Sequence, residues 1–147
     1  MADAYRQILD LVISTVTGCA TTGARVYESP AAAIASGSLP ALAVEPISEE
    51  VAETFESADS DDHLERHRLT VAVWTIATSI ADRDASAGEV KQALVGTVAS
   101  YIGWKRRFTR SEFQERVDGE KPLYAVGQRF EIDFHVTATQ PDVIVTS

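Results

Sequence analysis

The sequence predicts an α+β domain with a single, mainly antiparallel β-sheet and two main helices packed on one of its faces. Every second residue from Phe130 to Val136 is apolar and the residues between are polar, the period of two of a half-buried strand. Residues 90–102 repeat apolar side chains at helical spacing instead. Two strand-rich stretches precede and follow that helix, and strands joined by short loops favour antiparallel pairing.

The N-terminal third predicts a helix, a short strand and a second, short helix. Apolar residues recur at helical spacing over residues 3–17, with Asp3 placed as N-cap and Gly18 as the left-handed stop. Residues 25–27 suit a short strand. A serine and a proline precede residues 31–36 and a glycine follows them, which predicts a helix there.

A long strand pair is expected next. A strand is predicted to begin at Ala41 and to continue through Phe55, and the acidic, serine-rich span 56–62 reads as an exposed loop. Residues 69–80 are rich in β-branched and aromatic residues and predict a strand covered on both faces for part of its length. Arg66 and Arg68, just before it, share one parity and therefore one face.

The second main helix is predicted from a capping box. Ser86 and Glu89 can satisfy each other's free backbone donors, and the apolar stripe of residues 90–102 follows directly. Gly103 ends the pattern. The expected helix is therefore about 17 residues long, with one apolar face.

Two strands complete the predicted sheet. The first lies within residues 108–117, and a bulge or a preceding loop is expected because Phe108 and Phe113 differ in parity. The second occupies residues 123–138. We expect one domain over residues 1–147, with residues 140–147 as a flexible tail.

Composition restricts the function classes. The 147 residues carry 13 Lys+Arg and 22 Asp+Glu, a formal charge of −9, which argues against tight binding to a nucleic-acid backbone. Cys19 is the only cysteine, so no disulfide forms within the chain. The first six residues lack a signal-peptide pattern, and the longest uncharged stretch, residues 29–44, contains two prolines and is too short to span a membrane. A soluble protein made in the cytoplasm is expected.

The sequence offers no convincing catalytic, cofactor or metal site. His63 and His67 are four residues apart among acidic residues, but the pattern lacks the glutamate of a zinc-hydrolase helix and suits a solvated loop that leads into a strand. His135 lies on the polar side of the last strand, and Cys19 suits a small, partly buried position. No phosphate loop, dinucleotide fingerprint or nucleophile elbow is present.

Two charged segments are candidate contact surfaces. The acidic run between residues 49 and 62 is by default a solvated edge. The basic triplet after Trp104 can neutralise a helix C-terminus, meet an acidic neighbour or bind the phosphate of a nucleic acid, and the net charge disfavours the last. A complementary patch on an identical neighbour would make each of them a subunit contact. The candidate interface residues are Glu49, Glu50, Asp59, Asp61, Asp62, Lys105, Arg106 and Arg107.

Three segments together carry a family resemblance. They are the Arg25-Val26-Tyr27 … Leu39-Pro40-Ala41-Leu42-Ala43-Val44 stretch, the run Arg66-His67-Arg68-Leu69-Thr70-Val71-Ala72-Val73, and the capped helix that leads to a terminal hairpin. Their order resembles the tail terminator family of long-tailed bacteriophages (minor tail protein U-like) over nearly the whole chain.

The resemblance implies a non-enzymatic structural protein that acts in the virion, at the head-proximal end of the tail. Such a domain forms a hexameric ring with copies of itself, caps the tail tube to end its polymerisation, and offers a surface to the head-completion protein. DNA passes through the ring without specific binding, and no cofactor or membrane is involved. Two alternatives stay open: another small neck or tail-completion adaptor, and a metal-dependent hydrolase that uses His63 and His67.

Overall fold

The computed structural model of the chain describes residues 3–28, 39–56, 62–96, 105–118 and 121–145. The predicted short helix at residues 31–36 lies outside them. The described elements are, in chain order, α1 (Ala4–Val16), β1 (Val26–Tyr27), β2 (Ala41–Glu56), β3 (His63–Ala77), α2 (Ile80–Val95), β4 (Lys105–Asp118), β5 (Lys121–Thr137) and β6 (Gln140–Val145).

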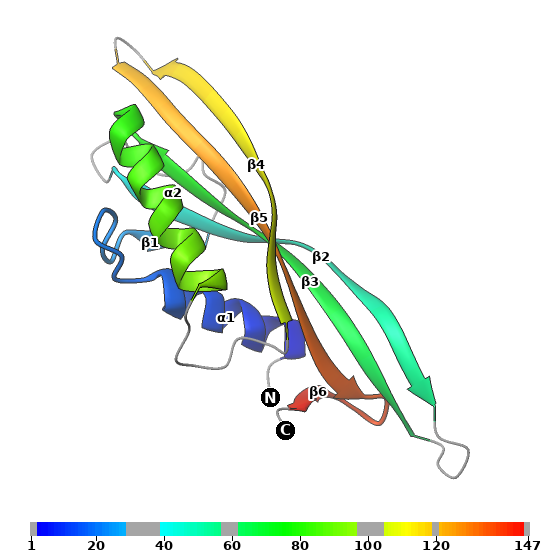
Figure 1. Ribbon diagram of the computed structural model, residues 1–147. Helices are drawn as coiled ribbons and strands as arrows, with labels where there is room; N and C mark the ends of the chain where they lie inside the picture. The colour runs from blue at the N-terminus through cyan, green and yellow to red at the C-terminus, as the bar shows by residue number, and fades with distance from the viewer. Residues whose placement is uncertain (1–2, 29–38, 57–61, 97–104, 119–120, 146–147) are drawn as a thin grey trace.

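The strands form one six-stranded sheet in the order β1-β2-β3-β5-β4, with β6 paired to β5. Only the β1–β2 pair is parallel. The sheet is long and twisted, and its strands reach beyond the helices at both ends: β4 and β5 at one end, β2 and β3 at the other (Figure 1). The predicted fold class, α+β with a mainly antiparallel sheet, is confirmed.

Both helices pack on the same face of the sheet and close one hydrophobic core with it. Alternation along the strands produces this face: the even-numbered residues of β5 from Phe130 to Val136 and the odd-numbered residues of β3 from Leu69 to Val73 point inward. The buried residues of the cluster are Ala4, Ile8, Leu9, Val12, Val16, Leu42, Val44, Leu69, Val71, Val73, Val90, Leu94, Phe130, Ile132, Phe134 and Val136.

The N-terminal helix matches the sequence prediction. The strand predicted at residues 69–80 is instead β3, His63–Ala77, so His63 and His67 lie on a strand and not in a loop. Asp3 caps α1 by accepting a hydrogen bond from the Tyr5 amide at 3.1 Å. Gly18 follows the helix with a φ of 95°, a left-handed conformation that favours glycine. Arg66 and Arg68 share the helix-free face of the sheet, opposite His135 and Asp133 of β5.

The predicted start of the second helix is wrong, and its predicted end at residues 102–103 lies outside the described residues. The helix begins at Ile80, capped by Ser79, whose hydroxyl accepts from the Asp82 amide at 3.1 Å. Ser86 is not a cap: it lies inside α2, fully buried, 3.2 Å from the Thr75 hydroxyl. The residues between the two serines are compatible with a helix, so the earlier cap extends it by about two turns. The described part of α2 ends at Val95.

The C-terminal strands confirm the predicted bulge but contain a strand where a flexible tail was expected. The predicted bulge is confirmed, since the register of β4 shifts between Phe108 and Arg110 and brings Phe108 and Phe113 to the same face. The expected tail instead contains β6, which pairs with β5 at His135 and Thr137. Within the described residues no helix is long and apolar enough to cross a membrane.

Candidate subunit interface at the two sheet edges

The sheet has two open edges, one formed by β2 and the other by β4. β1 pairs with β2 only at Leu42 and Ala43, so from Glu45 onward the outer edge of β2 has no strand partner in the described part of the chain. β4 pairs only with β5 there, and its outer edge is also open. Unpaired N–H and C=O groups of this kind are available to another chain.

The two edges carry opposite charge. β2 holds five glutamates and no Lys or Arg. The first six residues of β4, Lys105–Arg110, hold four cations and no carboxylate. The acidic and basic segments singled out in the sequence therefore lie on opposite sides of the molecule, with β3 and β5 between them.

The registers of the three strand pairs place these charges in one row across the sheet, that is, at the same height along the strand direction. Glu50 is opposite Arg68 of β3, which is opposite Asp133 of β5, which is opposite Lys105 of β4. The adjacent row crosses the sheet in the same way. Its members, from edge to edge, are Glu49, Leu69, Ile132 and Arg106.

The two rows lie on different faces. Leu69 and Ile132 belong to the core under the helices, so Glu49 and Arg106 leave the sheet on the helix side. Glu50 and Lys105 leave it on the helix-free side. Each face thus presents an acid at one edge and a base at the other, at one height.

The third predicted cation, Arg107, is engaged within its own chain. Its Nε donates to Glu131 Oε1 at 2.9 Å, and one terminal nitrogen lies 3.7 Å from Asp133 Oδ2. Arg68 Nε donates to the same aspartate at 3.0 Å, and this bond raises the pKa of Arg68. Arg107 is therefore part of a charge cluster on the helix-free face. Its guanidinium already has carboxylate partners in its own chain, which makes it a less suitable subunit contact than Lys105 or Arg106.

Asp133 is the centre of that cluster, and the sequence did not reveal it. Alternation placed it on the solvent-facing side of the last strand, yet only 1% of its side chain is exposed. Arg66 also lies near it, with Nε 3.9 Å from Oδ2. The shared parity of Arg66 and Arg68 could have indicated this cluster. Two arginines on one face of a strand are stabilised by a carboxylate on the same face of the neighbouring strand.

The acidic loop is described only in part, because residues 57–61 lie outside the described residues and Asp62 makes contacts within the chain. Asp59 and Asp61 are among the residues that the structure does not describe. Asp62 instead ties the start of β3 to the turn before β6: it accepts from the Thr139 hydroxyl at 2.7 Å, the Thr139 amide at 3.0 Å and the His63 amide at 3.0 Å. These bonds, led by the Thr139 hydroxyl, lower the pKa of Asp62.

Asp62→Asn is expected to remove an acid-sensitive part of the stability. A carboxyl group whose pKa is lowered by folding stabilises the folded state at pH values above the ordinary aspartate pKa of about 3.9. This stabilisation is lost as the pH falls through the lowered pKa. The unfolding temperature of the wild type should exceed that of Asp62→Asn most clearly above about pH 5. The gap should shrink toward pH 2 in a circular-dichroism series. A gap that stays constant to pH 2 would contradict this role.

The histidines pair with a carboxylate. Glu65 Oε2 lies 2.9 Å from His63 Nε2, and Glu65 Oε1 lies 2.9 Å from His67 Nε2. The bonds from His67 and His63 lower the pKa of Glu65. No group of three metal-binding side chains occurs among the residues that the structure describes.

Cys19 and His135 are both half-buried. Burial raises the pKa of the Cys19 thiol, with the Glu89 charge adding to it. Burial also lowers the pKa of His135 on the helix-free face, and the nearby Arg66 charge acts in the same direction. Both shifts favour the neutral side chain at neutral pH.

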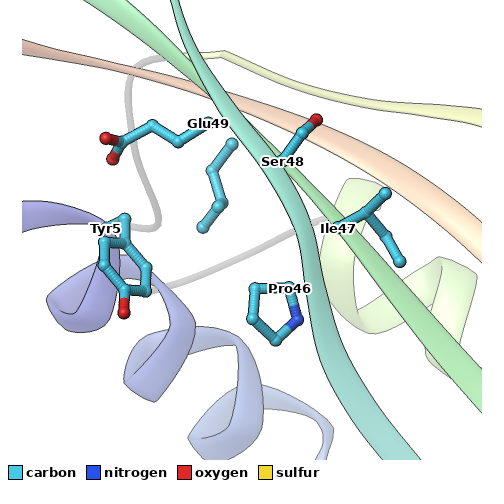
Figure 2. Close-up of a pocket in the computed structure, with 6 residues that line it drawn as sticks. Tyr5, Pro46, Ile47, Ser48 and Glu49 are labelled. Atoms are coloured by element: carbon cyan, nitrogen blue, oxygen red, sulfur yellow. The ribbon is translucent and has the colours of Figure 1, made fainter.

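A shallow groove of about 280 Å³ opens between α1 and the acidic edge. Figure 2 shows Tyr5 of α1 facing β2, with the Glu49 side chain extending from β2 toward the helix. No sequence pattern predicts this groove, because it depends on how α1 crosses β2. The residues that line the groove are Tyr5, Pro46, Ile47, Ser48, Glu49 and Leu69.

Large apolar side chains are exposed along the same two edge strands. On β2, Val51 is 52% exposed, Phe55 43% and Ile47 41%. On β4, Phe113 is 63% exposed, although Arg83 of α2 lies over its ring at 5.2 Å. Exposed aromatic and aliphatic groups beside complementary charges are typical of protein–protein contact surfaces.

No protein-family model matches the chain, and neither does any curated protein. Among the solved structures that do match is a chain of the "Virion of native gene transfer agent (GTA) particle". It shares 23% sequence identity, over 89% of this chain and 90% of that chain, with a TM-score of 0.44. Similarity at this level defines neither a family nor a function.

Proposed function

We propose that this protein is a structural, non-enzymatic component of a phage-like virion, and that within it the protein is the tail terminator. Copies of the chain form a ring, with six as the expected number, on the head-proximal end of the tail tube. The ring ends tube polymerisation and offers its other face to the head-completion protein. The residues quoted in the sequence analysis carry the resemblance to this family.

The placement of charge on the two open edges is the observation that carries the proposal. A closed ring needs a heterologous contact, in which one patch meets a different patch on the next subunit. Here Glu49 and Glu50 lie at one edge, and Lys105 and Arg106 lie at the same height on the other. Pairing two copies through β2 would bring glutamates together, whereas pairing opposite edges joins the acidic strand to the basic start of β4.

Strand direction is compatible with the heterologous contact. Three antiparallel steps separate β2 from β4, so the two edge strands run in opposite directions. When copies are arranged around an axis that runs along the strands, β4 of one copy faces an antiparallel β2 of the next. Repetition of this contact generates a ring if the rotation closes.

The proposed mechanism is steric. The ring presents a face that matches the tube on one side and no such face on the other, so further tube subunits have nowhere to add. A charge of −9 on each copy repels DNA. DNA that passes through the ring therefore does not adhere to it.

Negative-stain electron microscopy of the concentrated protein, with and without magnesium, tests the proposal. We expect rings with a central hole and about six-fold symmetry. Added to polymerising tail tube protein of the same virus, the protein should bind one end of each tube and shorten the mean tube length. Monomers that neither form rings nor change tube length would contradict the proposal. Binding to a portal or head-side ring in place of the tube would indicate a neck adaptor.

A further inference from the structure

We propose that Arg106 of one copy inserts into the groove between α1 and β2 of the next copy and pairs there with Glu49. This inference rests on the proposed ring and names the contact that joins neighbouring copies. It assigns a partner, a second copy of this chain, to a groove that has no occupant from the described part of its own chain.

The groove provides both an anion and an apolar wall. Glu49 is 33% exposed, and burial raises the pKa of its carboxyl group. Among the described residues its ion-pair partner is His67, whose Nδ1 lies 3.9 Å from Oε1 and which is charged only if protonated. Tyr5 and Leu69 line the same groove. A guanidinium suits such a site, because its planar face stacks on an aromatic ring and its nitrogens donate to the carboxylate.

Arg106 is the cation placed to reach the groove. It shares a row with Glu49 and leaves the sheet on the same, helix-covered side, at the opposite edge. It is half-buried, and its Nε has no hydrogen-bond partner among the described residues. Lys105 leaves the sheet on the other face, and Arg107 is occupied by Glu131. The Nε of Arg106 is buried within its own chain, so the contact uses the terminal nitrogens of the guanidinium. Arg106 therefore has the position and the charge that the groove requires.

The shape of the acidic edge favours a side-chain contact over a continuous backbone ladder. Pro46 lacks an N–H group, and the register of β2 shifts between Pro46 and Ser48 and again between Val51 and Glu53. Proline, bulges and charges on an edge strand oppose long pairing with another strand. Recognition between copies then depends on a few specific side chains, of which Glu49 and Arg106 have opposite charge at equal height.

A charge swap tests this pair. Arg106→Glu and Glu49→Arg should each weaken self-association at least tenfold, as measured by analytical ultracentrifugation, because each places like charges together. The double variant should recover most of the association. Arg106→Gln, which keeps the approximate length without the charge, should also weaken association and serves if the reversal perturbs folding. Circular dichroism checks the fold of each variant.

Arg110→Glu and Glu56→Arg are matched controls, because they make the same reversals on the same two strands away from this row. They should change association less than the paired residues do. Single reversals without effect, or a double variant without recovery, would overturn the pair while rings of the wild type remained. Wild-type protein that forms no ring, alone or on a tube end, would instead contradict the proposed function.

Discussion

Phe130→Ala is expected to lower the free energy of unfolding by about 3–5 kcal/mol, the usual range for removing a buried aromatic ring. Phe130 is 1% exposed and lies on the middle of β5, opposite Val71 of β3 and Phe108 of β4. Its ring centroid is 5.6 Å from that of Phe108, at an interplanar angle of 59°. The truncation leaves a cavity between the sheet and α2, which the surrounding strands cannot close.

Phe113→Ala is the matched control, because it removes the same ring from an exposed position on the neighbouring strand. Phe113 is 63% exposed, and Arg83 lies over its ring at 5.2 Å. We expect a loss below about 1 kcal/mol. Urea unfolding followed by circular dichroism measures both variants. Equal losses would mean that Phe130 does not occupy the core as described.

Asp133→Ala is expected to cost about 3 kcal/mol, at the low end of the range for removing one partner of a buried ion pair. The substitution leaves Arg66, Arg68 and Arg107 facing one another without the carboxylate that joins them. The low end applies because the three arginine side chains keep 22–31% of their surface exposed, so water screens part of the repulsion.

Asp84→Ala provides the comparison for that prediction. Asp84 is 60% exposed and pairs with Arg83 at 3.0 Å, a surface pair of the kind that contributes less than about 1 kcal/mol. Thermal unfolding of the two variants beside the wild type separates the buried cluster from a surface pair. If Asp133→Ala unfolds at the same temperature as Asp84→Ala, the cluster does not stabilise the fold.

Local patterns predicted much of the fold. Alternation in β5, the cap and stop of α1 and the parity of Phe108 and Phe113 each depend on neighbours in sequence. The start of α2 could not be read in the same way. Ser79 and Ser86 are both acceptable caps, and what excludes the second is tertiary: Thr75 of β3 lies 3.2 Å from its hydroxyl, inside the core.

The candidate interface was predicted in composition but not in geometry. The acidic and basic segments were visible as runs of charge, and Asp59 and Asp61 remain predictions. That Glu50 and Lys105 share a row depends on three strand registers, one of which joins β3 to β5 across more than 60 residues. Long-range pairing also decides that Arg107 and Asp62 bind within the chain. No local pattern encodes those partners.

Cysteine cross-linking between copies tests the heterologous contact most directly. Glu50 and Lys105 lie at opposite edges, three strand spacings apart, so cysteines there are separated by about 14 Å within one copy and cannot pair. In a Cys19→Ser background, we expect Glu50→Cys and Lys105→Cys to form covalent dimers under mild oxidation only when mixed. The double variant should form a ladder of multimers. Dimers of either single variant alone would show contact through like edges and contradict the ring proposed here.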